Sequence, residues 1–301
     1  MNEAQITEGS AAPGSEAPTP IVTPTEPSAS QIVVPAQACS TCNAARVPTL
    51  PVPNPWVYVI GDVDARYPNL AVEKEARGAM ARAKTSGLSN DAALQKVLDA
   101  PENGYLVREM CYVLLVQEVE TYILVPRHSQ DYPMLVEAAR TELSTVIGTL
   151  GPIANPDVCN GLTVPYLIFD VIFNFTKAAL IADLPTPKGA DAAKFRSAAT
   201  DIFNQIVPLI GNGTGMERAL AFELVKDPML YQVIASAFDQ DAQLASVELK
   251  AAPVNSTQNH VDVILRTQNR GNGAQSSVYA RVALGAKLPY VVTTWQPHLA
   301  P

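Results

Sequence analysis

Cys39 and Cys42, two of the four cysteines, stand three positions apart in the stretch ACSTCNAAR. A Cys-x-x-Cys pair can supply two zinc ligands, form a redox-active dithiol, or present thiols for chemical modification. A closed zinc site needs four ligands, and no second pair or histidine lies near this one in the sequence. Two copies in a homodimer would supply four ligands, so we keep a zinc site and a homodimer as hypotheses.

Cys159 is the second candidate for chemistry. It lies in PDVCNGL, where proline, asparagine and glycine predict a loop and hence an exposed thiol. A backbone amide can stabilise a thiolate there, but a cysteine nucleophile would also need His128 or His260 as its base. Cys111 opens the apolar run CYVLLV, which predicts a buried thiol that packs like a small apolar side chain.

Other catalytic motifs are weaker. The sequence holds three histidines and no GxSxG nucleophile motif. Glu118 and Glu120 could act as paired carboxylates on one side of a strand, but their place between two apolar runs favours a solvated turn. The stretch GNGTG at 211–215 follows a helix and lacks the lysine of a P-loop, so it predicts a helix-terminating turn. We therefore expect no bound cofactor other than the hypothetical zinc.

The first 55 residues differ in composition from the rest of the chain. They hold ten of the 25 prolines and only five charged residues. Few large apolar side chains are available there to offset the entropy of ordering, so residues 1–55 are predicted to be disordered. Residues 56–301 carry nearly all the aromatic side chains and are predicted to form a single folded domain.

The net charge limits the classes of partner. A formal charge of −8 argues against binding to nucleic acid or to an anionic membrane, since both depend on clustered Lys and Arg. The start MNEAQITEGS lacks the basic and apolar segments of a secretory signal, and the longest apolar runs are too short to span a bilayer. We expect a cytoplasmic protein with reduced thiols.

The pattern of apolar residues predicts the elements that position these side chains. WVYVIG from Trp56 indicates a buried strand, and Asn69 is the expected N-cap of a helix over LAVEKEARGAMARAK. Two strands joined at 117–120, a helix over YPMLVEAARTEL and a strand at STVIGTLGPI are expected next. LTVPYLIFDVIFNF fits either a strand or a buried helix.

The clearest helix is DAAKFRSAATDIFNQIVPLI, whose apolar residues at helical spacing predict one buried stripe, formed by Phe195, Ala199, Ile202, Ile206 and Leu209. Two more helices, around MERALAFELV and PMLYQVIASAF, are expected after it. SVELK, VDVILRT, SSVYARVAL and YVVTTW then alternate apolar with polar residues, which predicts a four-strand antiparallel meander with one solvent-exposed face. Together these segments predict an α+β fold, with a mixed or antiparallel sheet and several packed helices.

Two long stretches are distinctive. WVYVIGDVDARYPNLAVEKEARGAMARA from Trp56 and LGPIANPDVCNGLTVPYLIFDVI from Leu150 resemble the C-terminal domain shared by the PatA and PatG cyanobactin maturation proteins. CYVLLVQEVETYILVPR and the closing strands also resemble that family, so the resemblance covers roughly residues 56–298. Within NLAVEKE and the GPI-to-CNGL loop, the residues that carry the family motifs are Asn69, Leu70, Glu73, Glu75, Gly151, Pro152, Cys159, Asn160 and Gly161.

The resemblance implies a setting rather than a reaction. In cyanobactin proteins this domain follows a protease or macrocyclase domain in pathways that modify ribosomally made peptides, and it is known as a domain of unknown function. Only the Pro-rich segment precedes Trp56 here, so the resemblance does not imply cleavage or macrocyclisation by this chain.

Three functional hypotheses follow. The first is a non-catalytic interaction domain that binds a peptide or a peptide-modifying enzyme along an exposed edge of the C-terminal meander. The second is a peptide substrate carrier, in which the segment around Cys39 and Cys42 is itself modified. The third is a cysteine-dependent enzyme that uses Cys159.

Overall fold

The computed structural model of the protein describes residues 55–252 and 259–298. Cys39 and Cys42, and the predicted disordered segment up to residue 54, lie outside the described residues. Residues Val52–Pro301 group into one compact unit. The described strands are β1 (Trp56–Arg66), β2 (Cys111–Val116), β3 (Val119–Pro126), β4 (Leu143–Ile153), β5 (Pro165–Phe175), β6 (Ala242–Ala251), β7 (His260–Asn269), β8 (Gln275–Ala283) and β9 (Tyr290–Pro297).

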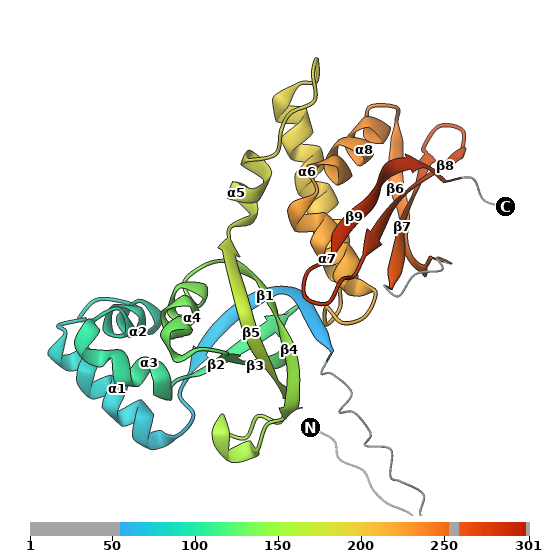
Figure 1. Cartoon of the computed structure of the whole chain (residues 1–301). Helices are drawn as coiled ribbons and strands as arrows, with labels where there is room; N and C mark the ends of the chain where they lie inside the picture. The colour runs from blue at the N-terminus through green and yellow to red at the C-terminus, as the bar shows by residue number, and fades with distance from the viewer. Residues whose placement is uncertain (1–54, 253–258, 299–301) are drawn as a thin grey trace, which may run out of the picture. The chain divides into compact units, whose positions relative to one another are not determined.

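Helices fall between these strands in two groups (Figure 1). The α-helices are α1 (Leu70–Arg82), α2 (Asn90–Leu98), α3 (Gly104–Glu109), α4 (Tyr132–Ala138), α5 (Lys177–Ala182), α6 (Ala192–Ile206), α7 (Glu217–Lys226) and α8 (Pro228–Phe238). Short 3₁₀ turns are η1 (Pro101–Asn103), η2 (Ser129–Asp131), η3 (Pro156–Val158) and η4 (Val207–Leu209). No helix of the described ranges is long and apolar enough to cross a membrane.

The first five strands close into a barrel in the order β1-β2-β3-β5-β4. The β3–β5 pair is parallel and the other pairs are antiparallel. β1 closes the barrel because residues 56–61 pair with β4 and residues 62–66 pair with β2. It changes partner next to Gly61, where a Cβ atom would lie 2.3 Å from the carbonyl oxygen of Leu115. Only glycine allows this approach of the two backbones.

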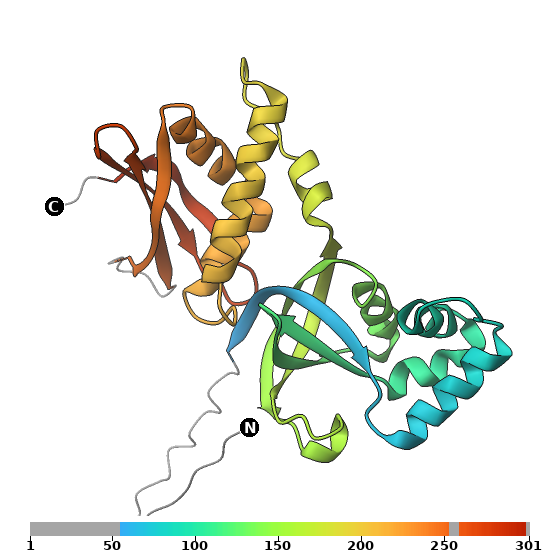
Figure 2. The ribbon, with the colours of Figure 1, turned by 180° about the vertical axis from the view of Figure 1, so that it is seen from behind.

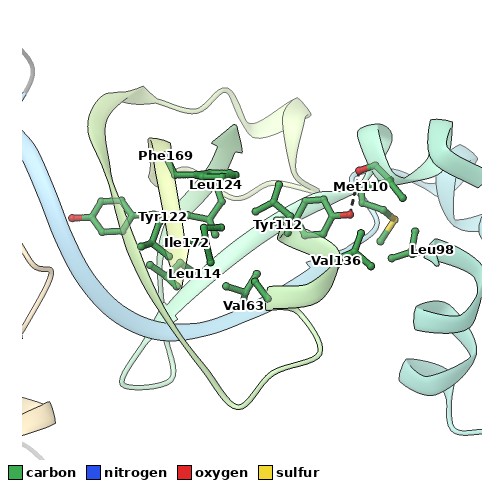
Figure 3. Packing of buried hydrophobic residues seen from close by; sticks show 14 of the residues in the cluster. Val63, Leu98, Met110, Tyr112, Leu114, Tyr122, Leu124, Val136, Phe169 and Ile172 are labelled. Carbon is green, nitrogen blue, oxygen red and sulfur yellow. Dashed lines mark hydrogen bonds between the residues drawn. The ribbon is translucent and has the colours of Figure 1, made fainter. Parts of the chain in front are cut away.

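The barrel interior and helices α1–α4 share one apolar core. Figure 3 shows Leu114, Tyr122 and Phe169 inside the barrel, with Tyr112 and Met110 extending the core toward the helices. The Tyr112 hydroxyl donates a 3.2 Å hydrogen bond to the carbonyl of Val107. The helices therefore continue the barrel core instead of forming a separate one.

The last four strands form an antiparallel sheet in the order β6-β7-β8-β9. Helices α6, α7 and α8 pack on one face of this sheet, as both views of the chain show (Figures 1 and 2). Val263 and Leu265 of β7 contribute to the apolar core on that face, together with Ile202 and Ile206 of α6.

The α+β class and the C-terminal meander predicted from sequence are confirmed. The ambiguous segment LTVPYLIFDVIFNF contains strand β5, and Asn69 caps α1 as predicted. The helical stripe is confirmed except at Leu209, which is 48% exposed because α6 gives way to η4 before it. The turn predicted at 211–215 is also present, and Gly213 accepts a 2.9 Å hydrogen bond from the Tyr58 backbone N–H.

Candidate functional site

Strand β9 forms one edge of the C-terminal sheet. Within the described residues it pairs with β8 and with no other strand. Its exposed face carries Tyr290 and Val292, which are 47% and 49% exposed, and Leu288 just before it is equally exposed. An unpaired strand edge presents backbone N–H and C=O groups that an extended chain can pair with. We call Leu288–Pro297 the β9 edge.

The sequence limits the length of the β9 edge. Exposed and less exposed residues alternate along it, and Trp295 packs against the apolar core on the helix side. Pro289 and Pro297 stand at its two ends, and a proline lacks the backbone N–H needed for strand pairing. The edge therefore suits a short extended segment better than a long sheet-forming partner.

Helix α7 holds the connection that leads into β9. The Arg218 side chain is 6% exposed, and its Nη2 donates hydrogen bonds of 3.1 Å to the carbonyl of Leu284 and 3.0 Å to that of Lys287. Between these two carbonyls, Gly285 has a φ of +53°, and a Cβ atom there would lie 2.4 Å from the carbonyl oxygen of Leu288. A buried guanidinium and a tight glycine turn thus fix how the chain enters β9.

A second contact fixes the far end of β9. Trp295 Nε1 donates a 2.8 Å hydrogen bond to Asp227 Oδ2, and Asp227 Oδ1 accepts a 2.9 Å bond from the Met229 backbone N–H as the N-cap of α8. One carboxylate therefore joins the strand to the start of a helix. Both ends of the β9 edge are consequently anchored to α7 and α8.

Glu223 lies one helical turn before Asp227 and is completely buried. Neither of its carboxyl oxygens makes a hydrogen bond of ordinary geometry in the described part of the chain. Burial, together with the neighbouring Asp227 carboxylate as a smaller cause, raises the pKa of Glu223 to about 9. Glu223 is therefore neutral at pH 7, which avoids an unpaired buried charge beside the α7–α8 junction.

The β8–β9 connection also contacts the barrel. Lys287 Nζ lies 3.7 Å from Asp170 Oδ1 of β5, and Arg127 Nε lies 2.7 Å from the same oxygen. Burial alone would raise the pKa of Asp170, but the hydrogen bonds and charges of Arg127 and Lys287 outweigh it and lower the pKa. Asp170 therefore stays ionised and holds two cations at this junction.

Cys159 is not the exposed thiol that its loop predicts. It is 3% exposed and forms a disulfide with Cys111, 48 residues away, with a Cα–Cα distance of 5.7 Å. The loop buries it because Cys159 packs with Val113, Ile123 and Ala154 in a small apolar cluster. A disulfide sulfur cannot serve as a resting nucleophile, so the prediction of an exposed catalytic thiol is wrong. Cys111 is buried as predicted, but it is bonded.

The family-motif residues have structural roles in two loops that meet. The Asn69 side chain accepts hydrogen bonds from the Ala71 and Val72 backbone N–H groups at 3.0 and 3.1 Å and so caps α1. Asn160, with a φ of +47°, donates a 3.0 Å backbone hydrogen bond to the carbonyl of Pro68, directly before that cap. The structure thus brings the two most distinctive sequence motifs together.

The other motif residues are less central. Leu70 is 62% exposed, Glu75 is exposed, and Glu73 pairs with Arg77 one turn along α1 at 2.5 Å. Of the remaining motif residues, Gly151 and Pro152 lie near the end of β4, and Gly161 lies in the β4–β5 connection. At Gly151 a Cβ atom would lie 3.0 Å from the Tyr166 Cβ, and Gly161 has a φ of +93°.

A cleft of about 370 Å³ lies among helices α2, α3 and α4. Arg140 at this cleft forms ion pairs with Asp99 and Glu137, which line it as well. The charges of Arg140, Asp99 and Glu137 are therefore paired with one another rather than available to a ligand. No group of three or more His, Cys, Asp or Glu side chains is gathered for metal binding within 55–252 and 259–298.

These features define a class of protein: a closed barrel followed by a helix-backed antiparallel sheet with one anchored free edge. The PatG domain family matches residues 56–221 of this chain, and the PatG C-terminal family matches residues 189–298. The chain therefore belongs to the PatG domain family, which is linked to cyanobactin maturation. This confirms the resemblance found in the sequence.

A solved structure described as "PatG Domain of Unknown Function" has the same fold. It superposes with a TM-score of 0.65 at 17% sequence identity, over 81% of this chain and 98% of its own. Among curated proteins, none matches this chain significantly.

Proposed function

We propose that this protein is a non-catalytic recognition domain whose β9 edge pairs with an extended segment of a cyanobactin-type precursor peptide. The observation that carries the proposal is that β9 pairs only with β8 among the described strands, with Leu288 and Val292 exposed along it. Strand addition obtains affinity from backbone hydrogen bonds and selectivity from alternate side chains. Ribosomal peptides in maturation pathways are chains that can adopt such an extended form.

The anchoring of β9 supports this role. Arg218 fixes the entry to the strand and the Trp295–Asp227 hydrogen bond fixes its end. A strand that is already ordered binds a peptide without the entropy cost of ordering its own backbone. The edge is thus preorganised for strand addition.

The other edge of the same sheet, β6, is a poorer template. Its exposed residues are mostly small or polar, and Lys250 places a charge on the strand, a feature that discourages strand pairing. The exposed apolar residues of the β9 edge can pack against alternate side chains of a peptide, whereas β6 offers few such contacts. The proposal therefore assigns binding to β9 alone.

The experiment measures the affinity of a fluorescein-labelled cyanobactin precursor peptide by fluorescence anisotropy. The wild-type protein should bind, and Val292→Lys should weaken binding by about tenfold or more, because it introduces an edge charge and removes an apolar contact. Ala245→Lys adds the same charge to exposed β6 and is the matched control, with a change of less than about twofold. Equal losses in both variants would refute the assignment to β9, and no binding at high micromolar concentration would refute peptide recognition.

Two other occupants of the β9 edge give different results. A second copy of the chain would appear as a concentration-dependent dimer in light scattering that Val292→Lys dissociates. A peptide-modifying enzyme would bind the wild-type protein in a pull-down while the free peptide does not compete. Either result would contradict the assignment of a peptide as the occupant.

A further inference from the structure

The disulfide between Cys111 and Cys159 has no part in the function proposed for the β9 edge. It joins the first residue of β2 to the connection between β4 and β5, residues 154–164. Both cysteines are buried, at 5% and 3% exposure, and pack with Val113 and Ile123 in a small apolar cluster. A disulfide is still a reactive group, because a thiolate that reaches one of its sulfurs can exchange with it.

A cleft leads from solvent to Cys159. The cleft has a volume of about 270 Å³, and Cys159 lines it together with Arg66, Tyr67, Glu120 and residues 160–162. Cys111 is not among the described residues that line the cleft. A small thiol that enters the cleft therefore meets Cys159 rather than Cys111.

The charged groups around this cleft are mainly carboxylates. Arg66 on the cleft wall forms ion pairs with Asp64 and Glu120. Burial raises the pKa of Tyr67 on the same wall, and nearby charges on α1 and α2 also act on this group. Two arginines and four carboxylates are thus gathered here: Arg66, Arg77, Asp64, Glu73, Asp91 and Glu120. This excess of negative charge repels an anionic thiol and attracts one that carries an ammonium group.

A disulfide cross-link and weaker contacts hold the segment 154–164 in place. The backbone N–H of Asn160 donates a 3.0 Å hydrogen bond to the carbonyl of Pro68, two residues before α1. The N–H groups of Ala154, Gly161 and Leu162 instead bond to carbonyls of the segment itself, at 3.0, 2.7 and 3.0 Å. Most side chains of the segment are exposed. Such a segment can open locally while the barrel stays folded, and this opening gives a thiol room to reach Cys159.

We propose that the Cys111–Cys159 disulfide is a redox site that accepts electrons from a small thiol without negative charge. A first thiolate attacks Cys159 Sγ, which forms a mixed disulfide and breaks the bond to Cys111, and the Cys111 thiolate takes up a proton. A second thiolate attacks the small-molecule sulfur of the mixed disulfide, and Cys159 leaves as a thiolate and is protonated. Two electrons and two protons have then passed to the protein, and the two small thiols leave as one disulfide.

Reduction changes the order of one segment. Without the cross-link, the Asn160–Pro68 hydrogen bond and the apolar cluster still hold residues 154–164, so this segment opens more often. The pairings of β1 to β5 do not depend on the disulfide and remain. The thiol therefore controls how firmly the β4–β5 connection is held against β2 and against the start of α1.

The reaction is followed in the full-length variant that combines Cys39→Ser with Cys42→Ser, so that Cys111 and Cys159 are its only cysteines. Three thiols that share a two-carbon chain are compared at pH 8: cationic cysteamine, neutral 2-mercaptoethanol and anionic 2-mercaptoethanesulfonate. The ionic strength is about 10 mM, where screening is weak. Each rate is divided by the rate of the same thiol with a small uncharged disulfide, which removes differences in thiol reactivity.

The products are identified by mass after alkylation with N-ethylmaleimide and digestion with trypsin, which places Cys111 in fragment 109–127 and Cys159 in fragment 141–177. Early samples should contain cysteamine on fragment 141–177 and an alkylated Cys111. The corrected rate with cysteamine should exceed that with 2-mercaptoethanesulfonate by about threefold or more. Cysteamine on fragment 109–127 instead would overturn the choice of Cys159 as the attacked sulfur. A disulfide that none of the three thiols reduces in the folded protein would overturn the redox site.

The charge of the cleft is tested separately. Adding Glu120→Gln removes one carboxylate from the cleft wall and should reduce the rate ratio between cysteamine and 2-mercaptoethanesulfonate. Glu102→Gln changes an exposed carboxyl that does not line the cleft, so this matched control should leave the ratio as it is. Equal corrected rates for the three thiols, or the same ratio in both variants, would overturn selection by charge.

Hydrogen exchange tests the consequence of reduction. Reduced protein should exchange faster within residues 154–164 than the disulfide form, with no change within residues 290–297 of β9. Because this comparison uses no peptide, its result is independent of whether the β9 edge binds one. Faster exchange throughout the barrel strands would show that reduction unfolds the domain, and unchanged exchange in 154–164 would show that the disulfide does not hold the segment. Either result would overturn the proposed control.

Discussion

Trp295 Nε1 and Asp227 Oδ2 are 2.8 Å apart, and this hydrogen bond joins the last residues of strand β9 to the first turn of helix α8. The same carboxylate caps the helix through the Met229 N–H. Edge strands are otherwise prone to fray, because one side of their backbone is unpaired. An ordered β9 edge therefore depends on a side chain that points away from the surface on which a peptide would bind.

Replacing Trp295 with Phe should loosen this strand. The variant keeps an aromatic ring in the core but leaves Asp227 Oδ2 without its indole donor, at a cost of about 1–3 kcal/mol in unfolding free energy. Trp56→Phe is the matched control. The Trp56 indole has no hydrogen bond like that of Trp295 within the described residues, so this substitution should lower the unfolding free energy by less. Urea denaturation measures both variants; equal losses would show that the hydrogen bond contributes nothing beyond ring packing.

Glu223 should make the stability of the protein depend on pH. Its pKa is about 9 in the folded protein and close to the ordinary 4.5 when unfolded, so the folded state retains a proton that the unfolded state releases. The free energy that the protonated Glu223 contributes to folding is fully present below about pH 4.5. It declines as pH rises and is lost once pH passes about 9. The loss amounts to at most roughly 3 kcal/mol between pH 6 and pH 8.

The variant Glu223→Gln removes this titration, so its stability relative to the wild type should increase from pH 6 to pH 8. Glu75→Gln changes an exposed carboxyl in the same way and should leave the pH dependence as it is. The measurement is the urea midpoint of each protein across that range. Parallel curves for the wild type and Glu223→Gln would contradict a neutral buried Glu223.

Gly148 tests the closure of the barrel. A Cβ atom at this position would lie 2.3 Å from the Ile168 carbonyl oxygen and 2.7 Å from the Phe169 Cα, both backbone atoms of β5. Gly148→Ala should therefore force β4 and β5 apart and cost about 1–3 kcal/mol or more.

The matched control for Gly148 is Gly78→Ala in α1, where the new methyl group meets only the flexible Arg82 guanidinium at 3.5 Å. Better helix propensity should make that variant more stable by about 0.5–1 kcal/mol. Thermal unfolding followed by circular dichroism compares the two variants. A Gly148→Ala protein as stable as the wild type would mean that the barrel strands are not this close.

Local patterns in the sequence predict most of the elements but not how they assemble. Asn69 is recognisable as a helix cap because a short polar side chain precedes an apolar pattern of helical spacing. The barrel depends on β1 pairing with both β2 and β4 and on a parallel β3–β5 pair, and these contacts leave no local pattern. The polar stretch GDVDAR was consequently not recognised as the second half of β1.

In the candidate site, too, local features could be predicted from the sequence and long-range contacts could not. The meander and its free edges follow from alternating residues, yet the Cys111–Cys159 disulfide joins positions 48 residues apart and could not be predicted from spacing. Glu223 did leave a signal. It shares the apolar face of its helix with Ala219 and Leu220, all three of them buried, and a carboxyl on such a face indicates a special environment.

Hydrogen exchange of the β9 amides, with and without a saturating cyanobactin precursor peptide, tests the central claim most directly. Strand addition predicts slower exchange within residues 290–297 on binding, because outward N–H groups gain partners, and no change within 242–251 of β6. Unchanged exchange in β9 together with protection at β6, or around the cleft among α2, α3 and α4, would contradict the account.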